Sequence, residues 1–147
     1  MEKRRYKKIY LDVCTLCRPF DNQNLMRIRL ETDAFNMILE QVFFKRYDLM
    51  VSSAHIQEIM AIEDDMERKQ IVSLLNEYGT TIFADLSSVL KRANLLYDSG
   101  FGTADAAHLA FAESSADCFI SCDDRLLRKY SKTDIPESVK IIGLNYL

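Results

Sequence analysis

The chain has 147 residues, of which 48% are hydrophobic and 28% are charged, a composition typical of one globular domain. Its formal net charge of −3 excludes a global basic field that would attract nucleic acid, and no stretch approaches the roughly 20 apolar residues of a membrane-spanning helix. We therefore expect a single domain over residues 1–147 that functions in the cytoplasm without disulfide bonds.

One local exception to this charge balance lies at the start of the chain. Its basic residues are Lys3, Arg4, Arg5, Lys7 and Lys8. This segment is too charged, and lacks the apolar run, for a secretory signal. It is interpreted as a solvated arm in front of a strand, with a phosphate-contacting edge as the alternative.

Short apolar segments alternate with helical patterns along the chain. In order, we expect a strand at 8–14, a loop at 18–23, a helix at 26–45, a strand at 47–52, helices at 53–62 and 64–78, a strand at 80–83, helices at 87–99 and 103–114, a strand at 118–121, a short helix at 125–130 and a strand at 139–142. This alternation predicts an α/β fold with three layers (α/β/α) around a central, mainly parallel sheet of about five strands.

Local signals place the ends of these helices. Ser52 or Ser53, Ser87 or Ser88, and Thr103 are the expected N-caps, and Gly79 is expected to stop the second of the two consecutive helices. In the helix at 53–62, the spacing predicts that Ile56, Ile59 and Met60 face inward.

Two acidic residues lie at or just after the ends of predicted strands. Asp12 lies near the end of the first strand, and Asp123 comes just after the fourth, in Ser121-Cys122-Asp123. Ligand sites of open parallel sheets form outside the carboxyl ends of the strands. We therefore expect these two carboxylates to lie at one edge.

Two further acids lie on helices expected to begin at that edge. Asp105 would be the second residue of a helix capped by Thr103, where the helix dipole by itself favours an acid. Glu58 lies one turn into its helix and, taken alone, is also compatible with a surface role. If all four carboxylates converge, their mutual repulsion requires a hard cation such as Mg²⁺ or Mn²⁺. Such an ion suits phosphodiester hydrolysis.

The order and spacing of these motifs resemble the PIN domain family, in particular the small stand-alone VapC-type toxins. The resemblance covers nearly the whole chain. It rests on Ile9-Tyr10-Leu11-Asp12, on Ser53 through Ile59 with Glu58, on Thr103-Ala104-Asp105-Ala106 with His108-Leu109-Ala110, and on Phe119-Ile120-Ser121-Cys122-Asp123-Asp124.

The resemblance implies a metal-dependent ribonuclease that cuts single-stranded RNA and leaves a 5′-phosphate and a 3′-hydroxyl. It maps Asp12, Glu58, Asp105 and Asp123 onto the acidic quartet of the family. Asp12 and Asp105 would bind the first Mg²⁺ or Mn²⁺, and Glu58 and Asp123 would help to hold that ion or a second one. It further implies a small antitoxin partner and a homodimer.

The sequence departs from the family pattern at one position. Cys14 stands two residues after the first acid, where the family often has Asn, Ser or Thr, and Thr15 is the alternative source of a hydroxyl. The adjacent Asp123 and Asp124 leave two choices for the fourth acid. The pattern Ser121-x-Asp123 fits the family better, so Asp123 is preferred.

Three other side chains near the expected site have open roles. Arg18 either contacts a phosphate or braces the loop that follows the first strand. His55 and His108 lie within a turn of site acids and are interpreted as packed or solvent-facing rather than catalytic.

Four cysteines are present: Cys14, Cys17, Cys118 and Cys122. Their irregular spacing argues against a structural zinc site, and the residues around Cys14-x-x-Cys17 argue against a thioredoxin-like motif. We expect reduced, small buried side chains.

Two alternative functions remain open. A haloacid-dehalogenase-like phosphatase also uses an Asp after the first strand, but it needs a second acid where Cys14 stands. The second alternative is a catalytically silent PIN-like module that binds RNA or a protein.

Overall fold

The centre of the molecule is a five-stranded parallel sheet. The computed structural model describes residues 7–132 and 140–144. The strands are β1 (Lys8–Leu11), β2 (Asp48–Val51), β3 (Gly79–Thr81), β4 (Cys118–Ser121) and β5 (Lys140–Gly143). Their order across the sheet is β3-β2-β1-β4-β5, and every pairing is parallel. The predicted fold class is therefore confirmed, and the carboxyl ends of all five strands lie at one edge.

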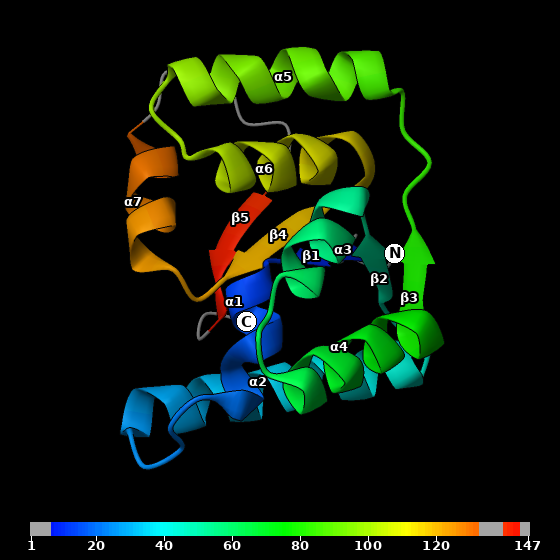
Figure 1. Cartoon of the computed structure of the whole chain (residues 1–147), viewed down its shortest axis with the longest axis vertical. Helices are drawn as coiled ribbons and strands as arrows, with labels where there is room; N and C mark the ends of the chain where they lie inside the picture. Colours follow the sequence, from blue (N-terminus) through cyan, green and yellow to red (C-terminus); the bar gives the residue numbers. More distant parts are fainter. Residues whose placement is uncertain (1–6, 133–139, 145–147) are drawn as a thin grey trace, which may run out of the picture.

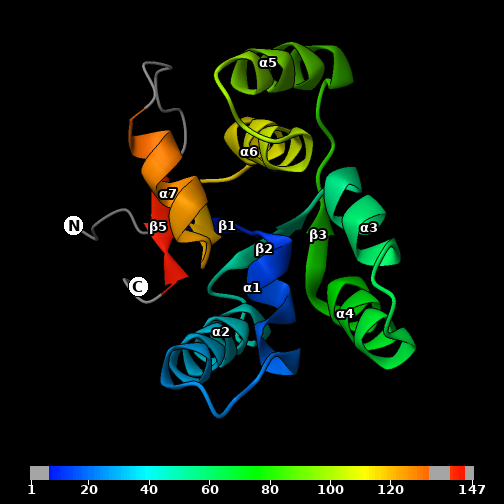
Figure 2. The same cartoon turned by 60° about the vertical axis from the view of Figure 1, so that its left-hand side comes forward.

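Helices cover both faces of this sheet. They are α1 (Val13–Cys17), α2 (Met26–Phe43), α3 (Ser53–Met60), α4 (Asp65–Tyr78), α5 (Leu86–Asp98), α6 (Thr103–Ser115) and α7 (Asp124–Ser131), with a short 3-10 turn at Arg18–Phe20. Figures 1 and 2 show α2 and α4 on one side of the sheet and α5 and α6 on the other. Within residues 7–132, α2, α4 and α6 return the chain to the starts of β2, β3 and β4.

Alternation along the strands divides the core into two clusters. In β1, Ile9 and Leu11 pack among residues of α1, α2 and α4, whereas Tyr10 packs on the opposite face with residues of α5, α6 and α7. In β4, Ile120 and Phe119 divide in the same way. Successive side chains of a strand point to opposite faces, so a sheet buried on both faces needs apolar residues throughout.

The first strand is shorter than the sequence pattern predicts. The strand ends at Leu11, and Asp12 caps the short helix α1. No helical periodicity in the sequence predicted this helix. The side chain of Asp12 accepts a hydrogen bond from the Thr15 N–H, as an N-cap does. Cys14 is therefore helical instead of lying at the end of a strand.

Two helices begin at N-caps other than the expected ones. For a third helix, the structure decides between Ser52 and Ser53. Ser52 caps α3. Asp85 caps α5 in place of Ser87 or Ser88, because its carboxylate accepts from both the Ser87 N–H and the Ser88 hydroxyl. Thr103 is already helical, and Gly102 precedes it without a side-chain cap.

The expectation of three inward residues on α3 was wrong for two of them. Ile59 is fully buried, but Ile56 and Met60 are 41% and 59% exposed. The helix buries only His55 and Ile59, which are one turn apart on one face. It lies across the edge of the sheet rather than flat on one of its faces, so the buried face is narrow.

Parts of the sequence predictions lie outside the described residues. They concern Val139 in the last strand and Lys3, Arg4 and Arg5 in the basic segment. Within residues 7–132 and 140–144, no helix combines the length and apolar character needed to cross a bilayer.

Gly79 provides a test of the packing between α4 and the sheet. A Cβ at this position would lie 2.4 Å from the carbonyl oxygen of Leu75 and 2.5 Å from Cγ2 of Val51. We expect Gly79→Ala to lower the free energy of unfolding by about 1–3 kcal/mol, the usual cost of overpacking. Urea denaturation measures this change.

The matched control for this test is Gly102→Ala, because a Cβ there meets nothing within 4 Å. Gly102→Ala should lower the free energy of unfolding by only a few tenths of a kcal/mol to about 1 kcal/mol, the usual effect of replacing an N-cap residue with a weaker one. Equal losses in the two variants would contradict the close approach at Gly79.

Candidate functional site

Asp12 is a buried carboxylate at the carboxyl end of β1. Its backbone N–H donates to the Ile120 carbonyl at 3.2 Å, which extends the ladder with β4 by one residue. The Oδ1 atom accepts from the Thr15 N–H at 3.0 Å and from the Thr15 hydroxyl at 2.6 Å. The Oδ2 atom accepts from the Ser121 hydroxyl. Thr15 thus supplies a hydroxyl to the first acid, although Cys14 stands where the family often has one.

Burial makes the charge of Asp12 costly. Its side chain is only 7% exposed, and desolvation raises the pKa of its carboxyl; the hydrogen bonds from Ser121, Thr15 and Cys14 oppose this rise. A raised pKa means that the surroundings favour the neutral acid at this position. An added cation would reverse that preference.

Ser121 connects Asp12 to Asp123. Its hydroxyl donates to Asp12 and accepts from the backbone N–H of Asp123 at 2.9 Å. Asp123 in turn caps α7, with its Oδ1 atom accepting from the N–H groups of Arg125 at 3.0 Å and Leu126 at 3.3 Å. Both acids expected from the strand ends are therefore fixed at the same edge.

Glu58 is held by a buried chain of polar side chains. His108 Nε2 lies 3.1 Å from Oε2 of Glu58, and His108 Nδ1 lies 2.5 Å from the Tyr10 hydroxyl. That hydroxyl also lies 2.7 Å from the hydroxyl of Ser52. A neutral His108 with its proton on Nε2 satisfies every contact, since it donates to Glu58 and accepts from Tyr10. The hydrogen bond from His108 is the main reason that the pKa of Glu58 is lowered.

His55 has a structural role beside this chain. Its Nε2 donates to the Leu11 carbonyl at 2.6 Å, and its Nδ1 accepts from the Ser52 N–H at 3.0 Å. Burial, assisted by the nearby His108, lowers the pKa of His55 to about 4. The ring is therefore neutral, and it joins the end of β1 to the start of α3.

Asp105 is the third residue of α6, and the other three acids lie within electrostatic range of its carboxyl. The pKa of its carboxyl is raised first by burial and then by the negative charges of Asp123, Asp12 and Glu58. Helices between parallel strands run back along the sheet, so the first turn of α6 lies at the carboxyl edge of the strands. The charge of Asp105 is thus opposed by the charges of the other three predicted acids.

Several acids outside the quartet form ion pairs with Lys or Arg in the described part of the chain, whereas the four do not. Among residues 7–132 and 140–144, Lys and Arg form ion pairs with Asp21, Glu31, Asp65, Glu113 and Asp124 but with none of the quartet. Arg27 binds Asp124 through two bonds of 2.7 and 2.9 Å. Asp124 therefore already has a counter-charge, and this supports Asp123 as the fourth acid.

Arg18 is engaged within its own loop. Its guanidinium donates to Glu31 at 3.1 Å and to Asp21 at 2.8 Å. Glu31 is buried on α2, so this pair fixes the chain after α1 against that helix. The bracing role considered for Arg18 fits these contacts better than a phosphate contact.

The cysteines are arranged differently from what their spacing suggests. Cys14 and Cys122 approach each other across α1 and the end of β4, with 3.1 Å between the sulfurs. In the described part of the chain, Asp12, Cys14 and Cys122 form a group whose possible metal-binding atoms all lie within 4.8 Å of one another. The pKa of the Cys14 thiol is raised by its hydrogen bond with Cys122, by burial and by the charge of Asp12.

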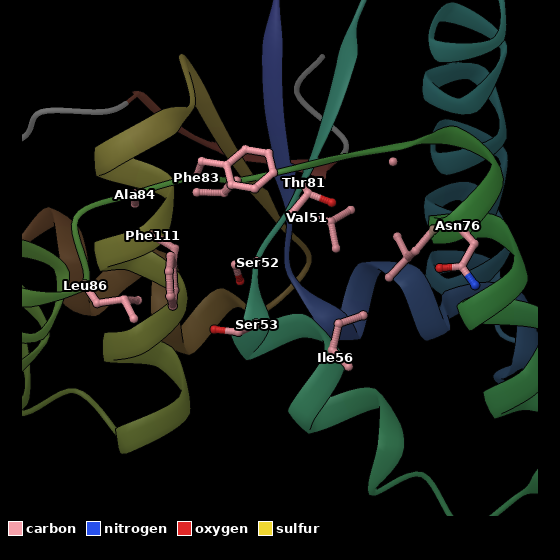
Figure 3. A pocket seen from close by; sticks show the side chains of 13 residues that line it. Val51, Ser52, Ser53, Ile56, Asn76, Thr81, Phe83, Ala84, Leu86 and Phe111 are labelled. Atoms are coloured by element: carbon pink, nitrogen blue, oxygen red, sulfur yellow. The ribbon is translucent and has the colours of Figure 1, made fainter.

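A separate pocket lies between β3 and the helices α3 and α6. It has a volume of about 580 Å³ and is lined mostly by apolar residues, including Ile56, Phe83 and Phe111 (Figure 3). None of the four acids lines it. Ser52, which also belongs to the chain that holds Glu58, is the link between the pocket and the acidic edge.

Sequence reasoning missed two residues that position Glu58. His108 was interpreted as packed or solvent-facing, and Tyr10 was treated only as part of a strand. His108 follows Asp105 by three residues, which places both on neighbouring positions of one helix face, and this spacing was the available signal. The partner of Tyr10 depends on the sheet order and had no signal in the sequence.

The fold agrees with that of a known structure. No protein-family model matches the sequence, and no curated protein matches it either. The crystal structure of FitAcB from Neisseria gonorrhoeae is similar over 95% of this chain and 99% of that one, with a TM-score of 0.57 and 14% identity. At this identity the likeness establishes the fold. The chain is thus an α/β protein with the PIN-like fold that its motifs predicted and with an acidic site at the carboxyl edge of its sheet.

Acidification provides a test of the buried neutral His55. The folded-state pKa of His55, about 4, lies below the ordinary histidine pKa of 6.5, so the unfolded chain binds more protons between these values. The resulting stability is complete above about pH 6.5 and is lost as the pH falls toward 4. At about 1.4 kcal/mol per pH unit, the loss is on the order of 3 kcal/mol.

The test compares the wild type with His55→Gln by urea denaturation at several pH values without metal. Asp12 and Asp105 have raised pKa values and act in the opposite direction, but both proteins share them. The wild type should therefore lose its advantage over His55→Gln as the pH falls. Parallel stability curves would show that His55 is not buried in its neutral form.

Proposed function

We propose that this chain is a divalent-metal-dependent endoribonuclease that cleaves single-stranded regions of RNA, and that it is the toxin of a toxin–antitoxin pair. One observation carries the proposal: Ser121 joins Asp12 to Asp123 at the carboxyl edge of the sheet, Asp105 lies in the first turn of α6, and none of the four acids has a Lys or Arg partner among the described residues. Four acids gathered in this way fit a cation-binding role. The PIN-like fold and the family motifs supply the reaction.

The donor set fits Mg²⁺ or Mn²⁺. All four groups offer carboxylate oxygens, which hard divalent cations prefer, and such ions keep several waters and need only a few protein ligands. Asp12 and Asp105 would bind the first ion, with Glu58 and Asp123 completing that site or holding a second ion. When bound, the metal would lower the pKa of a water and neutralise charge on the phosphoryl group.

The chain itself contributes fixed orientation. Thr15 and Ser121 hold both oxygens of Asp12, and His108 holds Glu58. Asp123 is restrained by the N–H groups at the start of α7. Carboxylates that are already oriented by outer hydrogen bonds lose little freedom when they bind a metal or position a water.

Hydrolysis by an oriented water would leave a 5′-phosphate and a 3′-hydroxyl. This product pattern comes from the family resemblance. Selection for single strands fits a site at an open sheet edge, because the scissile phosphate must approach carboxylates that are partly buried among helix ends. Metal neutralisation also explains how an acidic edge can accept an anionic substrate.

Protein partners form part of the proposal. Many large apolar side chains of α2 and α5 are exposed, more than isolated surface residues would explain. They include Met26, Leu30, Met37, Phe43, Leu86, Leu90, Leu95 and Tyr97. These surfaces are compatible with the small antitoxin and the homodimer that the family resemblance implies.

Neither alternative has a specific observation in its favour. The phosphatase reading needs an acid at position 14, where Cys14 instead lies against Cys122. The silent-module reading rested on the same departure, but Thr15 provides Asp12 with a hydroxyl contact.

Metal binding is tested by thermal unfolding with and without Mn²⁺ or Mg²⁺. A cation that binds only the folded chain at about 100 times its Kd adds about 2.7 kcal/mol, which raises the Tm by several degrees. In Asp105→Asn we expect a higher Tm than the wild type without metal, because one repelling charge is gone, and a much smaller response to metal.

The control for this experiment is Asp33→Asn, which changes the same charge on the exposed surface of α2. It should keep the wild-type response to metal. A wild type whose Tm does not respond to millimolar Mn²⁺ or Mg²⁺ would contradict the metal site.

Cleavage is tested on a mixed pool of single-stranded RNA with Mn²⁺. We expect Asp12→Asn and Asp123→Asn to lower the cleavage rate by at least about 100-fold, since each removes a group that holds the metal or positions water. The matched control Asp124→Asn removes the neighbouring acid, which is paired with Arg27, and should keep most of the activity.

Two results would overturn these assignments. Full activity in Asp12→Asn would refute the mechanism. Activity lost in Asp124→Asn but kept in Asp123→Asn would assign the fourth role to the other acid.

A further inference from the structure

Two thiols lie directly beside the acidic site, at positions that the proposed hydrolysis does not use. Cys14 is the second residue of α1, and Cys122 lies between β4 and Asp123. Their sulfurs are 3.1 Å apart, and the Cys14 thiol is hydrogen-bonded to the Asp12 carboxylate. The atoms of Asp12, Cys14 and Cys122 that could bind a metal all lie within 4.8 Å of one another.

We propose that Asp12, Cys14 and Cys122 form a binding site for a soft divalent cation of the zinc type, with water at the fourth position. This site is distinct in its chemistry from the hard-cation site formed by the four acids. Thiolates select zinc-like ions, whereas Mg²⁺ takes oxygen ligands. Binding transfers the two thiol protons to solvent and places two sulfurs and one oxygen on the metal.

The distances suit a shared metal ion better than a disulfide. With Zn–S bonds of about 2.3 Å in a tetrahedron, two sulfurs lie about 3.8 Å apart. The pair at 3.1 Å therefore needs to open by roughly 0.7 Å, which small side-chain rotations provide. A disulfide at about 2.05 Å would require the sulfurs to move about 1 Å closer.

The carboxylate ligand is already oriented for this role. Oδ1 of Asp12 accepts from the N–H and the hydroxyl of Thr15, whereas Oδ2 accepts from the Ser121 hydroxyl and keeps a further lone pair for the ion. Outer hydrogen bonds of this kind are the usual supports of metal-binding carboxylates. Cys14 is only half-buried, which leaves a path for the ion from solvent.

Asp12 would then be shared between two kinds of metal. A zinc-type ion held by the two thiolates takes the carboxylate that the proposed nuclease needs for Mg²⁺ or Mn²⁺, so it should inhibit cleavage. This consequence rests on the proposed function. The binding itself does not, and it is measured separately.

Binding is tested with the purified, fully reduced full-length chain. Titration with Co²⁺, as a spectroscopic substitute for Zn²⁺, should produce thiolate-to-metal charge-transfer absorption that saturates at one ion per chain, and Zn²⁺ should displace it. Cys14→Ser and Cys122→Ser should each weaken binding by at least about 100-fold, the upper end of what the loss of a mere outer partner costs. Cys17→Ser, which removes another half-buried thiol of the same helix, is the matched control and should bind like the wild type.

Several results would overturn the site. Absence of the absorption band in the reduced wild type would do so, as would a band that persists in the double variant Cys14→Ser/Cys122→Ser. Peptide mapping that finds a Cys14–Cys122 disulfide under reducing conditions would show that the thiols serve a covalent bond instead.

A second measurement separates this inference from the proposed nuclease. Zn²⁺ should suppress the Mn²⁺-dependent cleavage of the wild type but not that of Cys14→Ser, with each protein normalised to its own activity without zinc. A chain that binds Co²⁺ through the thiols yet never cuts RNA would support the site and refute the nuclease. Cleavage without thiol-dependent binding would do the reverse.

Discussion

The burial of the Asp12 carboxylate between β1 and β4 is the constraint on which the rest of the site depends. A carboxylate that is 7% exposed is costly unless every oxygen has partners. The chain meets this requirement from both sides, with Thr15 from the helix that Asp12 itself caps and Ser121 from the neighbouring strand. The same contacts fix where α1 begins. They also fix the N–H of Asp123, because Ser121 accepts from it. One buried charge therefore sets the positions of two strand ends and a second acid.

A second polar network fixes the opposite half of the edge. Tyr10 from β1, Ser52 at the end of β2 and His108 from α6 form a continuous chain that ends on Glu58 of α3. In the part of the chain that the structure describes, no buried side-chain oxygen or nitrogen lacks a hydrogen-bond partner. A fully satisfied buried network is rigid, and removing one member would leave its neighbours unpaired. Asp12, Asp123 and Glu58 are thus held by two networks that meet at β1.

The sequence predicted those features of the fold and the site that depend on patterns within a short segment of the chain. Buried apolar runs marked the strands, and parallel topology then brought Asp12 and Asp123 to one edge, as expected. The PIN-like fold was predicted from the motifs and confirmed by the likeness to a solved structure. Asp105 and Glu58 had no decisive local signal, and the family order was needed to select them.

The parts that the sequence did not predict depend on contacts between distant segments. Cys14 and Cys122 are 108 positions apart, and only the adjacency of β1 and β4 brings their sulfurs together. The same holds for the bond between Tyr10 and His108. Helix α1 was missed for a local reason. Its five residues are too few for the helical spacing of apolar residues to repeat, and its apolar residues continue the pattern of the strand.

The positions of the arginines distinguish Asp123 from Asp124, which the sequence alone could not do. Arg27 binds Asp124 bidentately and also approaches Glu31, and Arg18 binds Glu31 as well. Arg18 and Arg27 are therefore committed to acids outside the quartet. If the quartet existed only to stabilise the fold, this arrangement would be unfavourable, because neighbouring like charges on buried or partly buried groups oppose folding when no cation is present. The described part of the fold tolerates the repulsion and gives its arginines to other acids, which is the distribution expected when the missing positive charge comes from a bound ion.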